Sequence, residues 1–523
     1  MSRKPMPKNT LSAGQRAAAY EQQQKIKVER LSENNEEKAD VKAVNPGINA
    51  EKETVVAPTE NIKLSPQKQK EKPQLQTVKV DLGVKIGQAQ KLHGVCNGPL
   101  SQSADISKLL KDIHVPYIRF DKTEGARSGY VVDISKVFPN MDADERDPQS
   151  YSFRQTDIHM LAAANTGAKI IFRLGESFDI GTPEHKFKLY ESYDKITTVC
   201  VNIIKHYNDY WANGFALGIE YFEVLSHTDI QAVREVNTDT EIFELYARIA
   251  NGIKLYDDKL RVGGMSFSSP SQFVRDFIRE CKKRNAPMDF LSISLYDTTP
   301  EAMGEHIEQY VHILKNSSYA NAQIIVSEWA YMPLVADMRE ASNILNTKSR
   351  ESAEKRRDFF EYHKNIYGAA FVAAGLLKML EYPEISAACL YSAEADSLWC
   401  GICDRFGIPQ KPYYALDSFA KLVSAGERIL CVSEQDSAYA HSGIYAAACG
   451  AQGSACVMLA AFDGCTSVDL RLDNIPDDVY TADIYMLDGV KNMELCHSIQ
   501  LSGMKKRMVL NISPYSVVFI KIY

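Results

Sequence analysis

The feature that most constrains the fold is a repeated alternation between short apolar stretches rich in β-branched residues and longer amphipathic stretches. The short stretches are typical of buried parallel strands, and the longer ones have the period and length of crossover helices. Eight strand candidates lie near His93 and at residues 117–120, 169–174, 221–225, 261–265, 290–294, 324–327 and 388–391. Helix candidates between them include residues 193–206, 241–256, 270–284 and 301–316. Eight such units predict an α/β fold, the (β/α)8 TIM barrel.

Two further regions flank the predicted barrel, which we place at residues 91–423. After Leu422 the helical periods stop, and short alternating stretches separated by Gly, Asp and Asn follow. This pattern predicts an accessory C-terminal β-sandwich at residues 424–523. Residues 76–90 contain an alternating strand that we expect to join this sandwich. Residues 1–75 are polar, with Tyr20 as their only aromatic residue, and predict a disordered tail.

Composition excludes several kinds of partner. A chain of 523 residues with 45% hydrophobic content can build a barrel and a second domain. The formal net charge of -7 gives no broad cationic surface, so we expect no nucleic-acid partner. No apolar run approaches the roughly 20 residues that span a bilayer, and no apolar signal segment follows Met1. We therefore expect no membrane partner and a cytoplasmic location.

Cysteine usage supports the same expectation about location. The 11 cysteines are odd in number and scattered, which is more typical of reduced thiols than of a disulfide framework. Cys400 and Cys403 form the single Cys-x-x-Cys pair, and we expect a loop with two buried thiols there. Without a second such pair, or a pair of histidines nearby, the spacing does not predict a metal site.

Two strand ends carry polar residues of catalytic type. Glu328 follows the apolar run 324–327, and His227 follows the strand at 221–225. Strand ends of this kind line the active site of such barrels, so we expect both side chains at one rim. Glycoside cleavage with retention uses two carboxyl groups about 5–5.5 Å apart, one as nucleophile and one as proton donor. Here a carboxylate stands at one of these ends and a histidine at the other.

Aromatic and acidic neighbours extend this candidate site. Trp329, beside Glu328, is expected to offer a flat apolar face to a sugar ring. Glu176 follows the strand at 169–174 and is expected at the same rim, in contact with the substrate. Trp211 and Trp399 are expected either to edge the site or to pack.

Several segments, taken in their order and spacing, carry a family resemblance. They read His-Tyr-Asn-Asp-Tyr-Trp-Ala-Asn-Gly-Phe at 206–215, Tyr-Ile-Arg-Phe-Asp at 117–121, Phe-Arg-Leu-Gly-Glu-Ser at 172–177, Asp-Phe-Leu-Ser at 289–292 and Lys-Pro-Tyr-Tyr-Ala-Leu at 411–416. With them the chain, from about Val78 to Tyr523, resembles glycoside hydrolase family 39. This is a clan A family of retaining enzymes that includes β-xylosidases.

The resemblance implies roles for several residues. Glu328 falls at the nucleophile position, Arg119 at an arginine that orients the nucleophile, and Tyr296 at a tyrosine near it. The family's fourth strand ends in Trp-Asn-Glu-Pro, where Glu is the acid/base and Asn binds the sugar 2-hydroxyl. In this chain Ser226 stands in the place of the Asn and His227 in the place of the Glu. The acid/base motif is therefore degenerate.

Two neighbouring positions add to this picture. Glu223, inside the fourth strand, is retained, and the resemblance implies a structural carboxylate there. The family's histidine on strand six is missing, with Ser294 where it would stand.

Three accounts of the function remain open. In the first, the protein is a retaining O-glycosyl hydrolase, and His227, Asp229 or Glu176 protonates the leaving group. An imidazole suits this work because it titrates near neutral pH. In the second, the protein is a catalytically inactive carbohydrate-binding or regulatory relic. In the third, an imidazolium attracts phosphate where a carboxylate repels it, and the protein is a glycoside phosphorylase.

All three accounts expect a carbohydrate or glycoside as the partner. The sequence has no Gly-rich nucleotide fingerprint and no His-Glu-x-x-His motif, so we expect neither a cofactor nor a metal. The oligomeric state does not follow from the sequence.

Overall fold

The computed structural model describes most of the chain from residue 74 onward. The described residues are 74–124, 130–177, 190–332, 361–395, 397, 400–434, 443–451, 453–462, 466–475, 480–502 and 507–523. The tail expected at residues 1–75 lies, except for its last two residues, outside this part of the chain.

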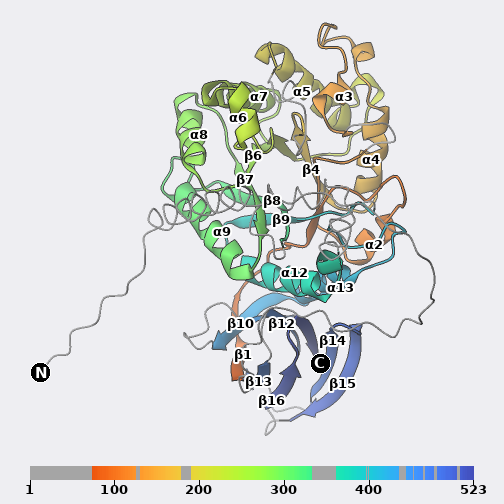
Figure 1. The fold of residues 1–523 in the computed structure, drawn as a ribbon, viewed down its shortest axis with the longest axis vertical. Coiled ribbons are helices and arrows are strands. Elements are labelled where there is room, and N and C mark those ends of the chain that lie inside the picture. Colours follow the sequence, from red (N-terminus) through yellow and green to blue (C-terminus); the bar gives the residue numbers. More distant parts are fainter. Residues whose placement is uncertain are drawn as a thin grey trace, which may run out of the picture. The chain divides into compact units, whose positions relative to one another are not determined.

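Eight parallel strands close into a barrel in the order of the sequence (Figure 1). They are β2 (Gly94–Cys96), β3 (Tyr117–Phe120), β4 (Lys169–Leu174), β5 (Tyr221–Val224), β6 (Arg261–Phe267), β7 (Phe290–Asp297), β8 (Gln323–Tyr331) and β9 (Ile385–Tyr391). A separate cluster of buried side chains, among them Ile171, Phe290 and Ile325, packs within the strands. This packing is typical of a barrel whose interior is filled rather than open.

Helices connect the barrel strands and cover them on the outside (Figure 1). The α-helices are α2 (Ser107–Asp112), α3 (Ile134–Val137), α4 (Arg154–Ala164), α5 (Tyr193–Asn208), α6 (Gln231–Val236), α7 (Asp239–Tyr256), α8 (Gln272–Lys283), α9 (Pro300–Lys315), α12 (Ile366–Met379) and α13 (Lys411–Ser424). Two 3-10 helices, η1 (Pro148–Ser150) and η3 (Trp211–Asn213), lie in connections.

Local sequence explains where several of these helices begin. Thr238 and Glu241 form a reciprocal capping box at the start of α7. The hydroxyl of Thr299 caps α9, and Pro300 occupies the first helical position. Such side chains satisfy backbone N–H groups that have no partner within the helix.

The remaining strands form one nine-stranded sheet in the order β15-β14-β17-β12-β11-β10-β1-β13-β16. They are β1 (Gln74–Gly87), β10 (Glu427–Glu434), β11 (Gly443–Ala451), β12 (Ser454–Phe462), β13 (Thr466–Asp473), β14 (Tyr480–Leu487), β15 (Asn492–Leu501), β16 (Arg507–Ile512) and β17 (Ser516–Ile522). The sheet folds back on itself, because β16 contacts β17 although six positions separate them in the strand order. Its inner faces share a core that includes Val80, Leu459 and Met508.

Apolar contacts join the C-terminal sheet to two helices of the barrel, α12 and α13. Both α12 and α13 pack against β11 and β12. Helix α12 also packs against β17 and α13 against β14 and β15, and Figure 1 shows these helices between the barrel and the sheet. Phe371 of α12 lies 5.9 Å from Phe462 of β12, measured between ring centroids. One face of β11 and β12 therefore packs into the core that includes the barrel helices, and the other face packs into the core of the sheet itself.

The fold class predicted from the sequence is confirmed: a (β/α)8 barrel is followed by a large C-terminal β-sheet region. The domain boundaries at 76–90, 91–423 and 424–523 stay a prediction, although β1 does pair with β10 and β13. In the part of the chain that the structure describes, no helix combines the length and the apolar character needed to cross a bilayer. The ten cysteines in that part are free thiols, and Cys400 and Cys403 are buried.

Candidate active site at the carboxyl end of the barrel

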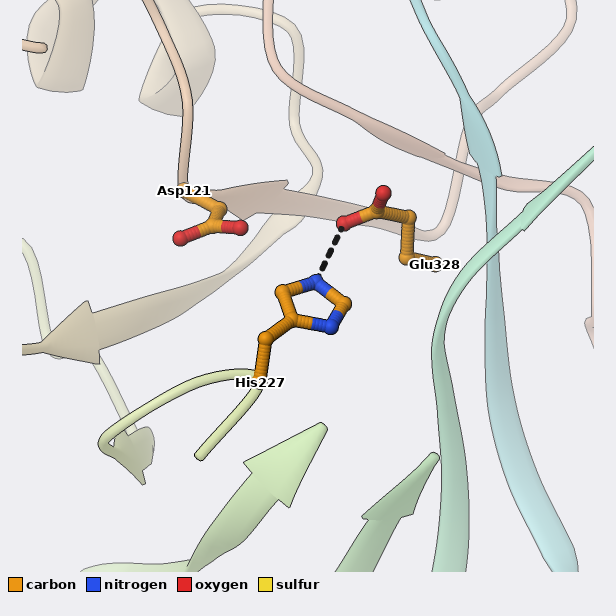
Figure 2. A group of neighbouring side chains, drawn as sticks. All are labelled: Asp121, His227 and Glu328. Carbon is orange, nitrogen blue, oxygen red and sulfur yellow. Dashed lines mark hydrogen bonds and ion pairs between the residues drawn. The ribbon is translucent and has the colours of Figure 1, made fainter. Parts of the chain in front are cut away.

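Residues from four barrel strands meet at this end of the barrel. Glu328 lies in β8, Tyr296 in β7 and Arg119 in β3, while His227 comes shortly after the end of β5. Figure 2 shows the side chains of His227 and Glu328 directed toward each other, with Asp121 beside them. About a hundred residues separate the two stretches in sequence, and barrel closure places them in contact.

Both carboxylate oxygens of Glu328 have partners. Oε1 accepts a hydrogen bond from the hydroxyl of Tyr296. Oε2 accepts a hydrogen bond from Nη1 of Arg119 at 3.2 Å and lies 3.3 Å from Nε2 of His227. Glu328 is 2% exposed, so these contacts are made away from bulk water. They hold the carboxylate in one orientation.

The surroundings of Glu328 keep it ionised. Burial by itself raises the pKa of this carboxyl group, but the positive charges of Lys122, His227 and Arg119 outweigh burial and hold the pKa well below its usual value. Burial and the charge of Glu328 raise the pKa of Tyr296 well above its usual value. Near neutral pH the pair is therefore a carboxylate and a neutral hydroxyl, and a buried carboxylate of this kind can act as a nucleophile.

The imidazole of His227 is held on both ring nitrogens. An ionised carboxylate only accepts hydrogen bonds, so Nε2 of His227 carries the hydrogen in the contact with Glu328. Nδ1 lies 3.3 Å from the hydroxyl oxygen of Ser268. The ring is mostly buried, since His227 is 7% exposed.

The chain leaves β5 through an unusual turn that carries this imidazole to Glu328. Leu225 and His227 have φ angles of 61° and 53°, in the left-handed region that favours glycine. The backbone N–H of His227 donates to the carbonyl of Met265 at 2.8 Å. Such a conformation costs free energy and persists where surrounding contacts enforce it, which is common at functional sites.

Two fully buried arginines connect the carboxylates below this contact. Nε of Arg119 donates to Glu223 at 2.7 Å, and Nη1 donates to Asp121 at 3.4 Å. Arg173 donates from Nε to Asp121 at 2.8 Å and from Nη2 to Asp133 at 2.5 Å. Burial raises the pKa of Asp121, but both guanidinium groups act against it and lower that pKa to about 2. Paired buried charges of this kind fix the position of Arg119.

Ser226 and Glu223 support Arg119 from the end of β5. The hydroxyl of Ser226 accepts a hydrogen bond from Nη2 of Arg119 at 3.1 Å, and Ser226 is buried. Glu223 is fully buried as well, in line with a structural carboxylate. A contact between Ser226 and a substrate stays a prediction.

Glu176 and Asp229 are carboxyl groups near the ends of β4 and β5. Glu176 accepts hydrogen bonds from the backbone N–H of Ser135 at 2.8 Å and from the hydroxyl of Tyr190 at 2.7 Å. Burial, together with the charge of Asp133, raises the pKa of Glu176 to about 7. Burial also raises the pKa of Asp229. Both groups hold a proton at a higher pH than an ordinary carboxyl group, and their contact with a substrate stays a prediction.

The prediction that Trp329 offers its face to a sugar ring is wrong. Its side chain is fully buried, lies beside Gly375 and has its ring centroid 6.3 Å from that of Phe371 in α12. Successive strand residues point to opposite faces, so the inward direction of Glu328 sends Trp329 outward into the helix layer. Trp211 packs edge-on against Tyr151 at 4.9 Å between centroids, and Trp399 lies outside the described residues.

Sequence reasoning missed Asp121 and Ser268 as members of the site. Asp121 immediately follows β3 and is fully buried, so its position after a strand was the available signal. Ser268 immediately follows β6 and gives no comparable signal, because serine is common in connections. Asp121, His227 and Glu328 each offer one possible metal-ligand atom, and these atoms all lie within 4.8 Å of one another.

A family model and several known proteins are similar to this chain. The model of the family described as "Glycosyl hydrolases family 39" matches residues 88–391. A β-xylosidase of Geobacillus stearothermophilus is 23% identical over 170 residues, which are 28% of this chain and 32% of that protein. The match thus spans about a third of the relative's length.

Solved structures show the same fold over most of the chain. A glucosidase from Croceicoccus marinus has a TM-score of 0.68 at 19% identity, covering 86% of this chain and 99% of that one. A monomeric β-xylosidase from Caulobacter crescentus has a TM-score of 0.61 at 13% identity, covering 85% and 99%. At such identities the likeness concerns the fold alone. The match of the family model over more than half of the sequence, 88–391, shows that the chain belongs to glycosyl hydrolase family 39.

Proposed function

We propose that this protein is a retaining O-glycosyl hydrolase with Glu328 as its nucleophile and His227 as its proton donor. The observation that carries the proposal is the placement of Glu328, a buried carboxylate within β8 whose two oxygens contact Tyr296, Arg119 and His227 and whose pKa is held well below its usual value. Arg119 and Tyr296 orient that carboxylate, and His227 contacts its Oε2. Membership of a glycosidase family supports a carbohydrate as the ligand.

The reaction has two steps. In the first, Oε2 of Glu328 bonds to the anomeric carbon as the glycosidic C–O bond breaks, and the leaving oxygen takes the proton from Nε2 of a His227 imidazolium. In the second, water attacks the anomeric carbon, the neutral imidazole accepts the proton of that water, and the bond to Glu328 breaks. The carboxylate and the imidazolium are then restored.

Substrate binding requires His227 to move. The gap of 3.3 Å between Nε2 of His227 and Oε2 of Glu328 is a hydrogen bond, shorter than the about 5–5.5 Å between the two carboxyl groups of retaining enzymes. A sugar ring cannot lie between atoms that close. We therefore expect the imidazole to turn away from Glu328 as the glycoside enters.

A trapping experiment tests the nucleophile. Incubation with a panel of 2-fluoro glycosides is expected to add one glycosyl group to the peptide that contains Glu328, detected by mass spectrometry. Glu328→Gln is expected to remove both the label and the turnover of aryl glycosides. Equal turnover in the wild type and Glu328→Gln would overturn the proposal.

A series of aryl glycosides whose leaving groups differ in acidity tests which residue is the proton donor. His227→Ala is expected to slow aryl glycosides with poor leaving groups by about 10²–10⁴-fold and to affect dinitrophenyl glycosides much less, because only poor leaving groups need a proton. Asp229→Asn and Glu176→Gln are the matched controls. If the steep dependence appears in one of these variants instead, that carboxyl group is the donor and the role of His227 is refuted.

The contact between His227 and Glu328 also supports a second candidate, a carbohydrate-binding protein without turnover. In this account the imidazole permanently blocks the attacking oxygen. It predicts saturable sugar binding by calorimetry, no product, and no label on Glu328 across a broad panel of 2-fluoro glycosides. A labelled Glu328 contradicts it. The free cysteines support a reducing compartment such as the cytoplasm as the place of either function.

A further inference from the structure

We propose that Asp121, His227 and Glu328 together bind one divalent transition-metal ion at the carboxyl end of the barrel. Asp121 directly follows β3, His227 lies shortly after β5, and Glu328 lies within β8. All three are buried, and their candidate ligand atoms lie within 4.8 Å of one another. Figure 2 shows the imidazole of His227 and the carboxylates of Asp121 and Glu328 gathered in one place, with the imidazole directed at Glu328.

The distance between His227 and Glu328 suits a shared ion. Two ligand atoms that each lie about 2.0–2.2 Å from a metal, at an angle near that of a tetrahedron, are roughly 3.3–3.6 Å apart. Nε2 of His227 and Oε2 of Glu328 have this separation, 3.3 Å. The oxygen of Asp121, within 4.8 Å of both, completes the set with a small side-chain movement.

Each of the three ligands is held by a second contact, as metal ligands usually are. Nδ1 of His227 faces the hydroxyl of Ser268 at 3.3 Å, which leaves Nε2 for a metal. Asp121 accepts a hydrogen bond from Nε of Arg173 at 2.8 Å. Glu328 accepts one from Tyr296 on Oε1, while Oε2, which accepts a longer hydrogen bond from Arg119, is the oxygen that faces His227.

The three ligands and the charged groups around them together carry a net negative charge, which favours the binding of a cation. Among the described residues, the buried carboxylates of this cluster are Asp121, Asp133, Glu223 and Glu328. They face two guanidinium groups, those of Arg119 and Arg173, and one ammonium group, that of Lys122. With His227 neutral, as a metal ligand must be, the negative charges outnumber the positive ones.

Arg119 is positively charged and could oppose a cation, but its longest hydrogen bonds are those to the proposed ligands Glu328 and Asp121. Its short contacts, 2.7 Å from both Nε and Nη2, go to Glu223. Its contacts with Glu328 and Asp121 are longer, at 3.2 Å and 3.4 Å. Glu223 thus compensates most of the guanidinium charge. A metal ion would compete with Arg119 only for its two longer contacts, those with Glu328 and Asp121.

The ligand types favour Zn²⁺, Co²⁺ or Mn²⁺. One imidazole with two carboxylates suits these ions better than Ca²⁺, which prefers oxygen ligands alone, or Cu⁺, which prefers sulfur. A metal on Oε2 of Glu328 occupies the same lone pairs that would attack a sugar. Metal binding and glycoside cleavage are therefore expected to exclude each other, but metal binding itself does not depend on the proposed hydrolysis.

Titration of the metal-free full-length protein with Co²⁺ tests the site. Visible d–d absorption and calorimetry are expected to show one ion per chain, displaced by Zn²⁺. His227→Ala is expected to weaken binding at least 10-fold, since about 10–100-fold follows even from loss of an outer contact. His312→Ala is the matched control, because His312 is exposed on α9, and is expected to bind Co²⁺ like the wild type.

Circular dichroism checks that each variant is folded, and His227→Gln serves as a second variant. Equal Co²⁺ affinity in the wild type and the folded His227 variants, or no binding at millimolar Co²⁺, would overturn this proposal. The 2-fluoro label on Glu328 reports on the hydrolysis separately. Metal binding without a label refutes only the proposed hydrolase, and a label without metal binding refutes only the metal site.

Discussion

At the scale of single residues, the environment decides what each histidine does. His227 contacts an ionised carboxylate, whereas His306 is paired with Asp297 at 2.9 Å, and this hydrogen bond raises the pKa of His306. His159 is buried in α4, and burial lowers its pKa to about 4. The same side chain is thus a candidate proton donor, a surface ion-pair partner and a neutral core residue.

His159 predicts a loss of stability in acid. Its pKa is about 4 in the folded state and 6.5 in an unfolded chain, so between these values the unfolded state binds a proton that the folded state rejects. The free energy of unfolding therefore falls as the pH falls from 6.5 toward 4, by about 2 kcal/mol between pH 7 and pH 5 from this group.

Urea titrations at the two pH values measure this effect. His159→Met, which removes the titrating group, is expected to lose about 2 kcal/mol less than the wild type on acidification. His312→Gln, exposed on α9, is the control and is expected to keep the wild-type difference. An unchanged pH difference in His159→Met would contradict the assignment.

At the scale of elements, close backbone approaches shape the barrel. Gly263 of β6 pairs with Phe290 of β7, and a Cβ added at Gly263 would lie 2.1 Å from the carbonyl oxygen of Phe290. Because backbone atoms of a closed barrel cannot move away easily, this position requires glycine. The next residue, Gly264, is similarly placed against the carbonyl of Val224 in β5, at 2.3 Å.

Gly263→Ala is therefore expected to destabilise the barrel. Overpacking of this kind typically costs about 1–3 kcal/mol, and more where backbone is the obstacle. The matched control is Gly489→Ala, at a position where an added Cβ meets no atom within 4 Å. Urea midpoints compare the two variants, and equal midpoints for both would show that the β6–β7 approach is not constrained.

At the scale of the whole molecule, the N-terminal strand joins distant parts of the chain. β1 lies between β10, with which it is antiparallel, and β13, with which it is parallel. It thus occupies an interior position of the C-terminal sheet, seventh in the order of nine strands, although it precedes the barrel in sequence. Without it, β10 and β13 would each present an unpaired edge, which promotes aggregation.

A shortened chain tests this role. Residues 91–523, which lack β1, are expected to give little soluble protein and no single cooperative urea transition, because the sheet is split into a group of six strands and a group of two. Residues 74–523 keep all the described strands and are expected to unfold cooperatively. If 91–523 were soluble and unfolded like 74–523, β1 would be dispensable.

Much of the fold could be predicted because its signals are local. The barrel strands and the long helices α5, α7, α8 and α9 fall at the predicted positions, since alternation and helical period report burial within each segment. Glu328 could be placed at the rim because it directly follows a buried apolar run. The error at Trp329 shows the limit of that argument, since two adjacent strand residues cannot both face the interior.

By itself, the sequence determined the type and order of the elements and the presence of a histidine, His227, shortly after the fourth barrel strand. Only the tertiary structure decided that His227 touches Glu328, that Asp121 joins them, and that Arg119 is shared between Glu223 and Glu328. The physical reason is that these residues lie on separate strands. Barrel closure, the turn after β5 and the pairing of buried charges set the distances between them, and no local pattern encodes those distances.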